Sequence, residues 1–265
     1  MKKFLACLCV MVLGLTVLAG CGAEAEKGKT VFTVGFDAEF PPYGYMDENG
    51  EYVGFDLDLA QEVCTRNGWE LVKQPIDWNA KDMELNNGNI SCIWNGFTMN
   101  GREEDYTWTT AYVDNSQVFA VAASSGIEKK ADLAGKVVAV QADSSALAAL
   151  NDEEVPENTA LRDSFADLIE YADYNTAFMD LEQGNVDAVA IDIGVASYQV
   201  EKREKGKFII LSEALATEQY GVGFKKGNTE LRDSVQKTLD AMADDGTFGK
   251  IAEKWGLSDS VCLGK

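Results

Sequence analysis

The chain has 265 residues, a formal charge of −21 and no histidine. Apolar residues make up 46% of it and aromatic residues 10%, which is enough to bury one or two ordinary globular cores and excludes a disordered chain. The large acidic excess makes nucleic acid and anionic lipid poor partners. Beyond residue 21 the cysteines are too few and too scattered for a disulfide scaffold, which leaves open a single bridge among Cys64, Cys92 and Cys262.

The amino terminus is typical of an export signal. Two lysines precede the apolar run 4–18, which is too short for a convincing membrane span. The sequence Leu18-Ala19-Gly20-Cys21 resembles the lipobox of bacterial lipoproteins, in which signal peptidase cuts before an acylated cysteine. We therefore expect residues 1–20 to be a lipoprotein signal peptide and residues 21–30 to be a tether lipidated on Cys21. The alternative is an ordinary export signal with an incidental cysteine.

From residue 31 onward, short apolar runs alternate with amphipathic stretches, the pattern of parallel strands joined by helices. The first half predicts a helix that opens with Asp56 as its N-cap and closes at Asn67-Gly68. The other elements predicted in this half are strands at 31–36, 70–74 and 90–94 and a helix at 80–87.

The second half repeats this order of elements. It predicts strands at 136–141, 168–171 and 186–191 and helices at 144–150 and 175–183. The segments "GNISCIWNG" (88–96) and "GNVDAVAID" (184–192) each run from a helix end through a Gly-Asn turn into a buried strand and then a polar residue. The repeat indicates two α/β lobes, and the extended runs 117–122 and 219–224 are predicted to cross between them as a hinge.

Ligand-facing loops of such lobes lie at the carboxyl ends of their strands. A ligand is therefore expected between the two lobes. Polar residues follow the predicted strands at these ends: Asp37, Asn95, Gly96, Thr98, Arg102, Gln141, Ser144, Ser145 and Asp192. They combine one cation with carboxylates and small hydrogen-bonding groups.

These pieces, in this order and at these spacings, resemble the extracytoplasmic solute-binding proteins of ABC transporters. The similarity is to the polar-amino-acid family, which includes glutamine-binding and lysine/arginine/ornithine-binding proteins, and it covers roughly residues 31–257. The segments that carry it are "FDAEFPPYGYMDENGEYVGFDLDLA", "NGFTMNGRE", "DLAGKVVAVQADSS", "GNVDAVAID" and "ELRDSVQKTLDAMADDGTFGKIAEKWG".

The resemblance implies specific roles at one end of the ligand. Arg102 falls where the family grips the ligand α-carboxylate, a task that suits the two parallel donors of a guanidinium. Asp192 falls at the acceptor for the α-ammonium. Gly96 and Thr98, with Asn95 just behind them, match first-lobe contacts to the same zwitterion.

The remaining implied contacts concern the second lobe and the ligand side chain. Gln141, Ser144 and Ser145 match the second lobe's loop at a helix N-terminus. Phe40 and Trp78 match two aromatic positions that sandwich the ligand side chain. Asp37 matches a carboxylate that reaches the far end of that side chain.

The resemblance implies the two-lobed periplasmic-binding-protein-like α/β fold of type II. Each lobe has a mostly parallel sheet flanked by helices, and there are two hinge crossovers. Lobe 1 is expected at residues 31–118 and 219–265, and lobe 2 at 119–218. The implied protein is a monomer without cofactor or metal, anchored through Cys21 on the extracytoplasmic face of the cell membrane. It would deliver a neutral polar or basic L-amino acid to an ABC transporter permease with its ATPase.

Two other functions stay open at this point. An extracytoplasmic dehydratase-type enzyme on the same fold would use carboxylates such as Asp37, Glu39 and Asp192 as acids. A ligand-sensing partner of a membrane receptor would share the same pocket. From the bare pattern, Arg102 fits a surface arginine paired with nearby acids better than a ligand contact, and the family position reverses that preference.

The chain departs from the family pattern at two positions. Asn100 replaces the second threonine of Gly-x-Thr/Ser-x-Thr-x-x-Arg, and the stretch to Arg102 is one residue shorter. Asp143 stands where the second-lobe loop usually carries a glycine. Both departures bear on the path of loops that are expected to touch the ligand.

Overall fold

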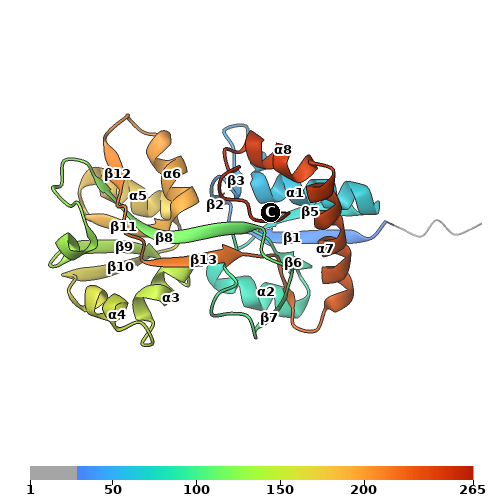
Figure 1. Ribbon diagram of the computed structural model, residues 1–265, viewed down its shortest axis with the longest axis horizontal. Helices are drawn as coiled ribbons and strands as arrows, with labels where there is room; N and C mark the ends of the chain where they lie inside the picture. The colour runs from blue at the N-terminus through green and yellow to red at the C-terminus, as the bar shows by residue number, and fades with distance from the viewer. Residues whose placement is uncertain (1–28, 265) are drawn as a thin grey trace, which may run out of the picture.

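The computed structural model describes residues 29–264, and the predicted signal peptide and Cys21 lie outside this range. The described chain forms two lobes, each built on its own β-sheet, and two long strands run from one lobe to the other (Figure 1). This is the two-lobed α/β architecture that the sequence predicts.

The sheet of lobe 1 has the strand order β5-β1-β6-β14-β7. Its strands β5, β1 and β6 are parallel, whereas β14 runs antiparallel to β6 and β7. A small antiparallel sheet, β2-β3-β4, lies in the same lobe. The bounds are β1 Val31–Phe36, β2 Glu39–Phe40, β3 Gly44–Met46, β4 Tyr52–Val53, β5 Glu70–Pro75, β6 Cys92–Ile93, β7 Tyr106–Trp108 and β14 Gly223–Lys225.

The sheet of lobe 2 has the order β10-β9-β11-β8-β12, and β13 also pairs with β8. Its strands β10, β9 and β11 are parallel and repeat the arrangement of β5, β1 and β6, so the internal repeat predicted from the sequence is present. Both sheets are mixed, because β8, β12 and β13 add antiparallel pairs to this one as β14 does in lobe 1. The bounds are β8 Val113–Ala122, β9 Val137–Gln141, β10 Asp167–Tyr171, β11 Ala188–Asp192, β12 Phe208–Ile210 and β13 Ala216–Tyr220.

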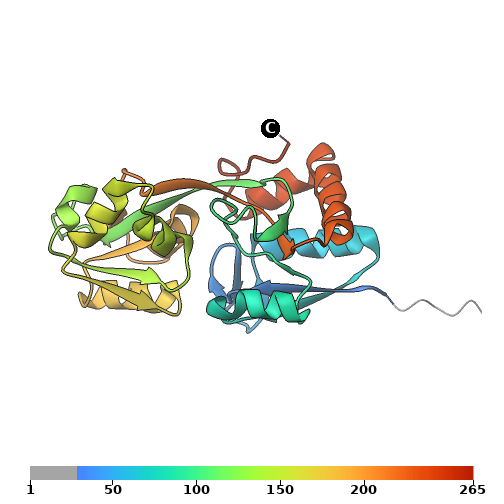
Figure 2. The same cartoon turned by 90° about the horizontal axis from the view of Figure 1, so that it is seen from below.

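Helices cover both sheets. In Figure 2, α1 and α2 lie on opposite faces of the lobe 1 sheet, as expected for strands joined by helical crossovers. The helices α4, α6, α7 and α8 were not among the predicted elements. The bounds are α1 Phe55–Asn67, η1 Trp78–Ala80, α2 Lys81–Asn87, η2 Lys130–Leu133, α3 Ser145–Asn151, α4 Pro156–Asp163, α5 Tyr174–Gln183, α6 Ile193–Glu201, α7 Thr229–Asp244 and α8 Thr247–Lys254.

The connection between the lobes depends on β8. Its first residue, Val113, forms a bridge with Val261 of lobe 1, while its second half pairs with β11 inside lobe 2. The strand β13 pairs with the first half of β8 and runs beside it across the gap (Figure 2). The predicted boundaries at 118/119 and 218/219 fall within these two strands. The second crossing lies earlier than the predicted run 219–224, because residues 223–225 already form β14 of lobe 1.

The start of α1 differs from the prediction. Asp56 is not the N-cap: the helix begins at Phe55, and Gly54 is the N-cap with φ 147° and ψ 166°. This backbone region is essentially restricted to glycine. Asp56 is fully buried in the first turn, where a carboxylate oxygen accepts the Gly96 N–H at 2.6 Å. The Asp56 carboxylate therefore holds the loop that follows β6. The strand predicted at 90–94 is shorter in the structure, where β6 spans Cys92–Ile93.

Gly54 is required for a second reason. A Cβ atom at this position would lie 2.1 Å from the Tyr43 carbonyl oxygen. We expect Gly54→Ala to destabilise the fold by about 3–5 kcal/mol, through the backbone clash and the unfavourable φ. Gly50→Ala is the matched control, since Gly50 has φ 81° and a Cβ atom there would meet no atom within 4 Å, and it should lose only about 1–2 kcal/mol. Urea unfolding of both variants tests this, and equal losses would contradict it.

Candidate functional site

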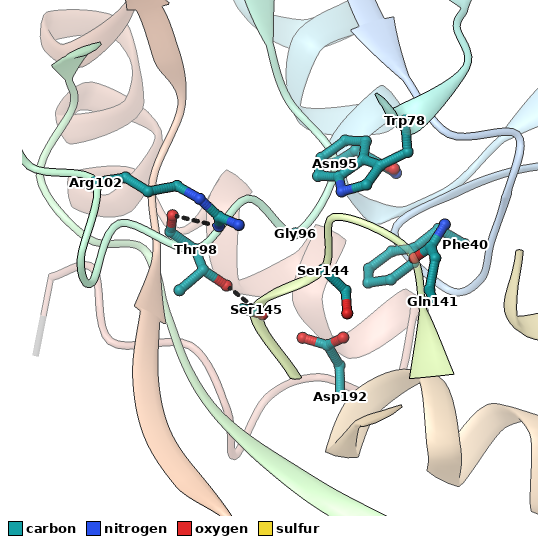
Figure 3. Close-up of a pocket in the computed structure, with 10 residues that line it drawn as sticks. All are labelled: Phe40, Trp78, Asn95, Gly96, Thr98, Arg102, Gln141, Ser144, Ser145 and Asp192. Carbon is teal, nitrogen blue, oxygen red and sulfur yellow. Dashed lines mark hydrogen bonds between the residues drawn. The ribbon is translucent and has the colours of Figure 1, made fainter. Parts of the chain in front are cut away.

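A small cavity lies between the two lobes. Ten of the residues that the sequence singles out line it together (Figure 3). They are Phe40, Trp78, Asn95, Gly96, Thr98, Arg102, Gln141, Ser144, Ser145 and Asp192. Six of them come from lobe 1 and four from lobe 2.

The lobe 1 wall is built mainly by the loop that follows β6. Gly96 has φ 56°, and a Cβ atom there would lie 2.9 Å from the Phe40 ring, so only glycine lets the loop pass so close to this aromatic wall. The Asp56 carboxylate fixes the Gly96 N–H from behind. Trp78 forms the second aromatic wall from η1, with its ring 5.6 Å from that of Phe97.

The shortened stretch before Arg102 forms a turn. The Arg102 N–H donates to the Met99 carbonyl at 2.9 Å, and Asn100, the residue that departs from the family pattern, accepts the Gln219 N–H of β13 at 2.8 Å. This turn directs the Arg102 side chain back along Thr98 (Figure 3), whose carbonyl accepts one guanidinium N–H at 3.3 Å. Within residues 29–264 that is the one hydrogen bond seen from the guanidinium, so its other donors are available to a ligand.

The lobe 2 wall is the turn between β9 and α3. Asp143 adopts φ 56°, a left-handed conformation that glycine adopts more readily. Ser144 is the N-cap of α3, with its hydroxyl accepting the Leu147 N–H at 3.2 Å, and Ser145 follows as the first helical residue. The Ser145 hydroxyl lies 3.2 Å from that of Thr98 in lobe 1.

Asp37 is the one predicted site residue that does not line the cavity. It is buried beside it, where its carboxylate accepts the Gln141 side-chain N–H at 2.7 Å and its own N–H donates to the Asn95 side chain at 2.9 Å. Burial raises the pKa of Asp37 to about 6, against the hydrogen bonds from Glu39 and Gln141 that stabilise the charged form. Asp37 therefore positions two cavity-lining amides across the lobes.

Asp192, at the end of β11, presents its carboxylate toward the centre of the cavity (Figure 3). One carboxylate oxygen, Oδ1, accepts from the side chains of Asn115, Gln117 and Tyr220 at 2.8, 2.7 and 2.5 Å. Burial, followed by the negative charge of Glu218, raises the pKa of Asp192 to about 7. No hydrogen bond to Oδ2 is seen in the described part of the chain, so this oxygen can accept from a ligand.

The polar cluster behind Asp192 was not predicted from the sequence. Glu218 on β13 is buried and accepts from Thr98, Asn115 and Gln117. One signal was available, because Gln117 starts the predicted crossing run 117–122 and Asn115 lies two residues before it, and alternate residues of a strand share a face. That pattern alone could not show that Glu218 lies opposite them.

Several contacts join the lobes around the cavity. Lys81 of lobe 1 is 2% exposed and pairs with Asp143 of lobe 2, and its ammonium lies 5.3 Å from the centre of the Trp78 ring. Asn175 of lobe 2 donates to Glu39 of lobe 1. The Phe40 and Tyr174 rings pack 6.0 Å apart across the same boundary. The structure is therefore the closed arrangement of the lobes.

The cavity carries a positive charge on one side and a negative charge on the other. Arg102 supplies guanidinium donors at one side, Asp192 supplies a carboxylate oxygen at the other, and aromatic rings enclose the remaining space (Figure 3). Such an arrangement complements a small molecule that carries a carboxylate and an ammonium group. Residues 29–264 contain no cluster of three or more potential metal ligands and no helix with the length and apolar character of a membrane span.

Curated relatives extend over almost the whole chain. The chain is 27% identical over 260 residues to the L-cystine-binding protein TcyJ of Escherichia coli strain K12, covering 94% of both chains. It is 29% identical over 264 residues to the lysine/arginine/ornithine-binding periplasmic protein of the same strain, covering 96% of this chain and 97% of the relative.

Solved structures share the fold. The crystal structure of an ABC uptake transporter substrate-binding protein from Streptococcus pneumoniae with bound histidine has a TM-score of 0.82 and 34% sequence identity, covering 87% of this chain and 94% of the neighbour. These similar proteins are binding proteins rather than enzymes, in agreement with the prediction of a non-enzymatic protein.

The two lobes, the interlobe cavity and these similarities agree with a family match that extends over residues 32–258. The chain belongs to the bacterial extracellular solute-binding proteins, family 3.

Proposed function

We propose that the protein is a receptor for an L-amino acid, which it binds between the lobes and delivers to an ABC importer. The observation that carries this proposal is the opposition of Arg102 and Asp192 across one closed cavity. The guanidinium would hold the ligand α-carboxylate with two parallel hydrogen bonds, and the carboxylate would accept from the α-ammonium. Relatives named for cystine, arginine, histidine and lysine/arginine/ornithine binding support an amino-acid ligand.

The charges around the cavity favour a neutral polar or basic ligand over an acidic one. Arg102 is taken by the α-carboxylate, and the second cation nearby, Lys81, is already paired with Asp143. An acidic side chain would then find no cation in the cavity to neutralise it. The side chain would instead lie between Phe40 and Trp78 and reach the amides of Asn95 and Gln141.

Ligand binding is coupled to closure because its contacts come from both lobes. A ligand that touches Arg102 in lobe 1 and Ser145 or Asp192 in lobe 2 makes all of these contacts only in the closed state, and it shifts the population toward that state. The closed form of a monomeric receptor would then dock on the permease of the importer. A ligand-sensing role beside a membrane receptor would use the same pocket and would differ in the protein that docks, so loss of uptake on gene deletion separates the two.

The ion pair between Lys81 and Asp143 adds to the closed state. Lys81 is 2% exposed and Asp143 about half exposed, so opening the lobes leaves the Lys81 ammonium without this partner. Asp143 can form the pair only because it accepts a left-handed backbone at the position where the family usually has glycine.

The export signal and Cys21 support a membrane anchor for this receptor. An acylated cysteine at the start of the tether would keep the binding domain beside the permease on the extracytoplasmic face.

A thermal-shift screen tests the amino-acid ligand. The purified protein, unfolded and refolded to remove carried-over ligand, should melt several degrees higher with a small set of the twenty amino acids, ornithine, citrulline and cystine, because a ligand that binds the native state stabilises it. Arg102→Ala should lose this shift, since two charge-assisted hydrogen bonds of about 1.5–3 kcal/mol each correspond to at least a hundredfold in Kd.

Arg232→Ala is the control, because Arg232 of α7 donates to the Trp108 carbonyl and lies outside the cavity. No shift with any compound would overturn the amino-acid proposal, and an unchanged shift in Arg102→Ala would overturn the assignment of the carboxylate.

Asp143→Asn tests the contribution of the ion pair. Asparagine tolerates the left-handed backbone but removes the charge, so binding should weaken by about 1–2 kcal/mol, or about fivefold to thirtyfold in Kd. Asp163→Asn is the control, because Asp163 pairs with Arg162 within lobe 2. Titration calorimetry measures both, and equal affinities for Asp143→Asn and the parent would show that the pair does not affect closure.

Cys21→Ala tests the anchor. The parent protein should sediment with membranes, and the variant should be released because it lacks the thiol that is acylated. Fractionation followed by immunoblotting measures this. Equal amounts of both proteins in the membrane fraction would contradict lipidation at Cys21.

A further inference from the structure

Glu218 lies one layer behind the cavity, where the hinge and both lobes meet. It belongs to the crossing strand β13 and is 7% exposed. Its Oε1 accepts from the Thr98 hydroxyl of lobe 1 at 2.8 Å and lies 3.3 Å from the Ser145 hydroxyl of lobe 2. Thr98 and Ser145 both line the cavity, so a carboxylate of the hinge holds one residue from each wall.

Two amides of β8 connect Glu218 to Asp192. The Asn115 amide nitrogen is 2.8 Å from Asp192 Oδ1 and 2.7 Å from Glu218 Oε1. The Gln117 amide nitrogen is 2.7 and 2.8 Å from the same two oxygens. The four groups therefore form a closed ring of hydrogen bonds, in which each amide donates to both carboxylates.

The ring brings two acidic groups together in a buried place. The amide oxygens of Asn115 and Gln117 are buried without a hydrogen-bond partner in the described part of the chain, so both amides are turned to give their donors to the carboxylates. These donors are neutral, and like charges that share them repel each other in the low-dielectric interior. In agreement, burial and the charge of Glu218 raise the pKa of Asp192 to about 7.

Other titratable groups around the pair do not relieve this repulsion. Three tyrosines face the pair: Tyr43 from the turn before β3, Tyr174 from α5 and Tyr220 from β13. Burial keeps the pKa of each phenol well above its ordinary value, so all three are neutral. Two further carboxyls face these tyrosines, Asp56 beside Tyr43 and Asp37 beside Tyr174. Burial raises the pKa of Asp56 to about 7 and that of Asp37 to about 6, and neither group brings a positive charge to the pair. The cation that lines the same cavity, Arg102, donates to the Thr98 carbonyl rather than to either carboxylate.

We propose that Glu218 is a positioning residue that forms one acidic pair with Asp192. Without a ligand this pair binds a proton, and on binding it exchanges that proton for the ammonium group of the ligand. This inference rests on the proposed function, which places the α-ammonium at Asp192. The ammonium donates to the free oxygen of Asp192, and the proton that this carboxyl held passes to the solvent. No other bond is made or broken.

The direction of the pH dependence follows from this exchange. The ligand-free pair holds more protons than the liganded pair, so binding releases protons and affinity rises with pH until Asp192 is ionised in both states. Below about pH 7 the proton and the ammonium compete for the same oxygen. The acidic pair therefore favours binding of the positively charged ammonium group of an amino acid. An analogue with an uncharged group in place of the amine lacks this favourable interaction.

Calorimetry with L-arginine and L-glutamine provides the test, because neither side chain titrates between about pH 5 and pH 8. Binding enthalpies measured at about pH 6 in phosphate and in bis-Tris, two buffers with different enthalpies of ionisation, give the number of protons released. We expect about one proton per ligand at about pH 6, close to none at about pH 8, and about tenfold weaker binding at the lower pH.

Two variants decide whether Glu218 is responsible. Glu218→Gln keeps an acceptor oxygen for the amides but removes the charge, while the burial of Asp192 remains, so proton release near pH 6 should fall clearly below the parent value and the pH profile should shift to lower pH. Asp114→Asn, which removes an exposed carboxylate from the hinge strand β8, should retain the full release. If Glu218→Gln releases as many protons as the parent, Glu218 is only a structural acceptor and the proposal is wrong.

Carboxyl ¹³C NMR of the ligand-free protein separates this proposal from the proposed function. Asp192 should titrate near neutrality in the parent and clearly lower in Glu218→Gln. An Asp192 carboxyl that titrates below about pH 5 in the parent overturns the acidic pair whether or not a ligand binds. If neither probe binds, the calorimetry is repeated with the amino acid that gives the largest thermal shift. If no amino acid binds while Asp192 titrates near neutrality, the amino-acid function fails and the exchange fails with it, but the pair itself stands.

Discussion

The hydrogen bonds that Asn115 and Gln117 donate to two buried carboxylates tie the binding site to the hinge. Both amides belong to β8, the strand that starts against lobe 1 and ends in the sheet of lobe 2. Asp192 belongs to lobe 2 and Glu218 to the second crossing strand. Because one strand provides the hinge and the donors, a change in the angle between the lobes must also change the contacts of the carboxylate at the centre of the cavity.

Closure of the lobes is a balance of opposed contributions. The packing of Phe40 on Tyr174 and the pair of Lys81 with Asp143 favour the closed state. The burial of Asp192 beside Glu218 opposes it, since two carboxylates lose water and gain only neutral donors. A ligand that contacts both lobes can shift such a balance toward the closed state. If the lobes closed firmly without a ligand, the transporter could not distinguish the liganded protein from the ligand-free protein.

Most of the fold could be predicted from the sequence because the repeat of apolar runs and amphipathic segments is local information. The predictions were wrong where tertiary contacts decide how a segment folds. Asp56 looks like a helix cap, yet it is buried under the Gly96 loop and Gly54 takes its place. The helices α4, α6, α7 and α8 were not predicted, and the second crossing, β13, begins three residues before the predicted run.

Ten site residues could be found because they match a motif and follow predicted strands. Glu218 could not, since one glutamate in a polar strand reads as a surface residue until the strand is paired. Its partners lie about a hundred positions away, and pairing across that separation is not visible in composition or periodicity. Asp37 matched the motif but lies beside the cavity, where its carboxylate accepts a hydrogen bond from the cavity-lining Gln141 amide.

The two departures from the family pattern show how the chain compensates for altered loops. Asn100 accepts the Gln219 N–H of β13, and this contact fixes the shortened turn that directs Arg102 into the cavity. Asp143 accepts an unfavourable backbone and reaches Lys81 across the cleft. Both contacts extend to another part of the molecule, one to the hinge and one to the opposite lobe. The loops that touch the ligand are therefore held by the same elements that move when the lobes close, and the orientation of Arg102 depends on the state of the hinge.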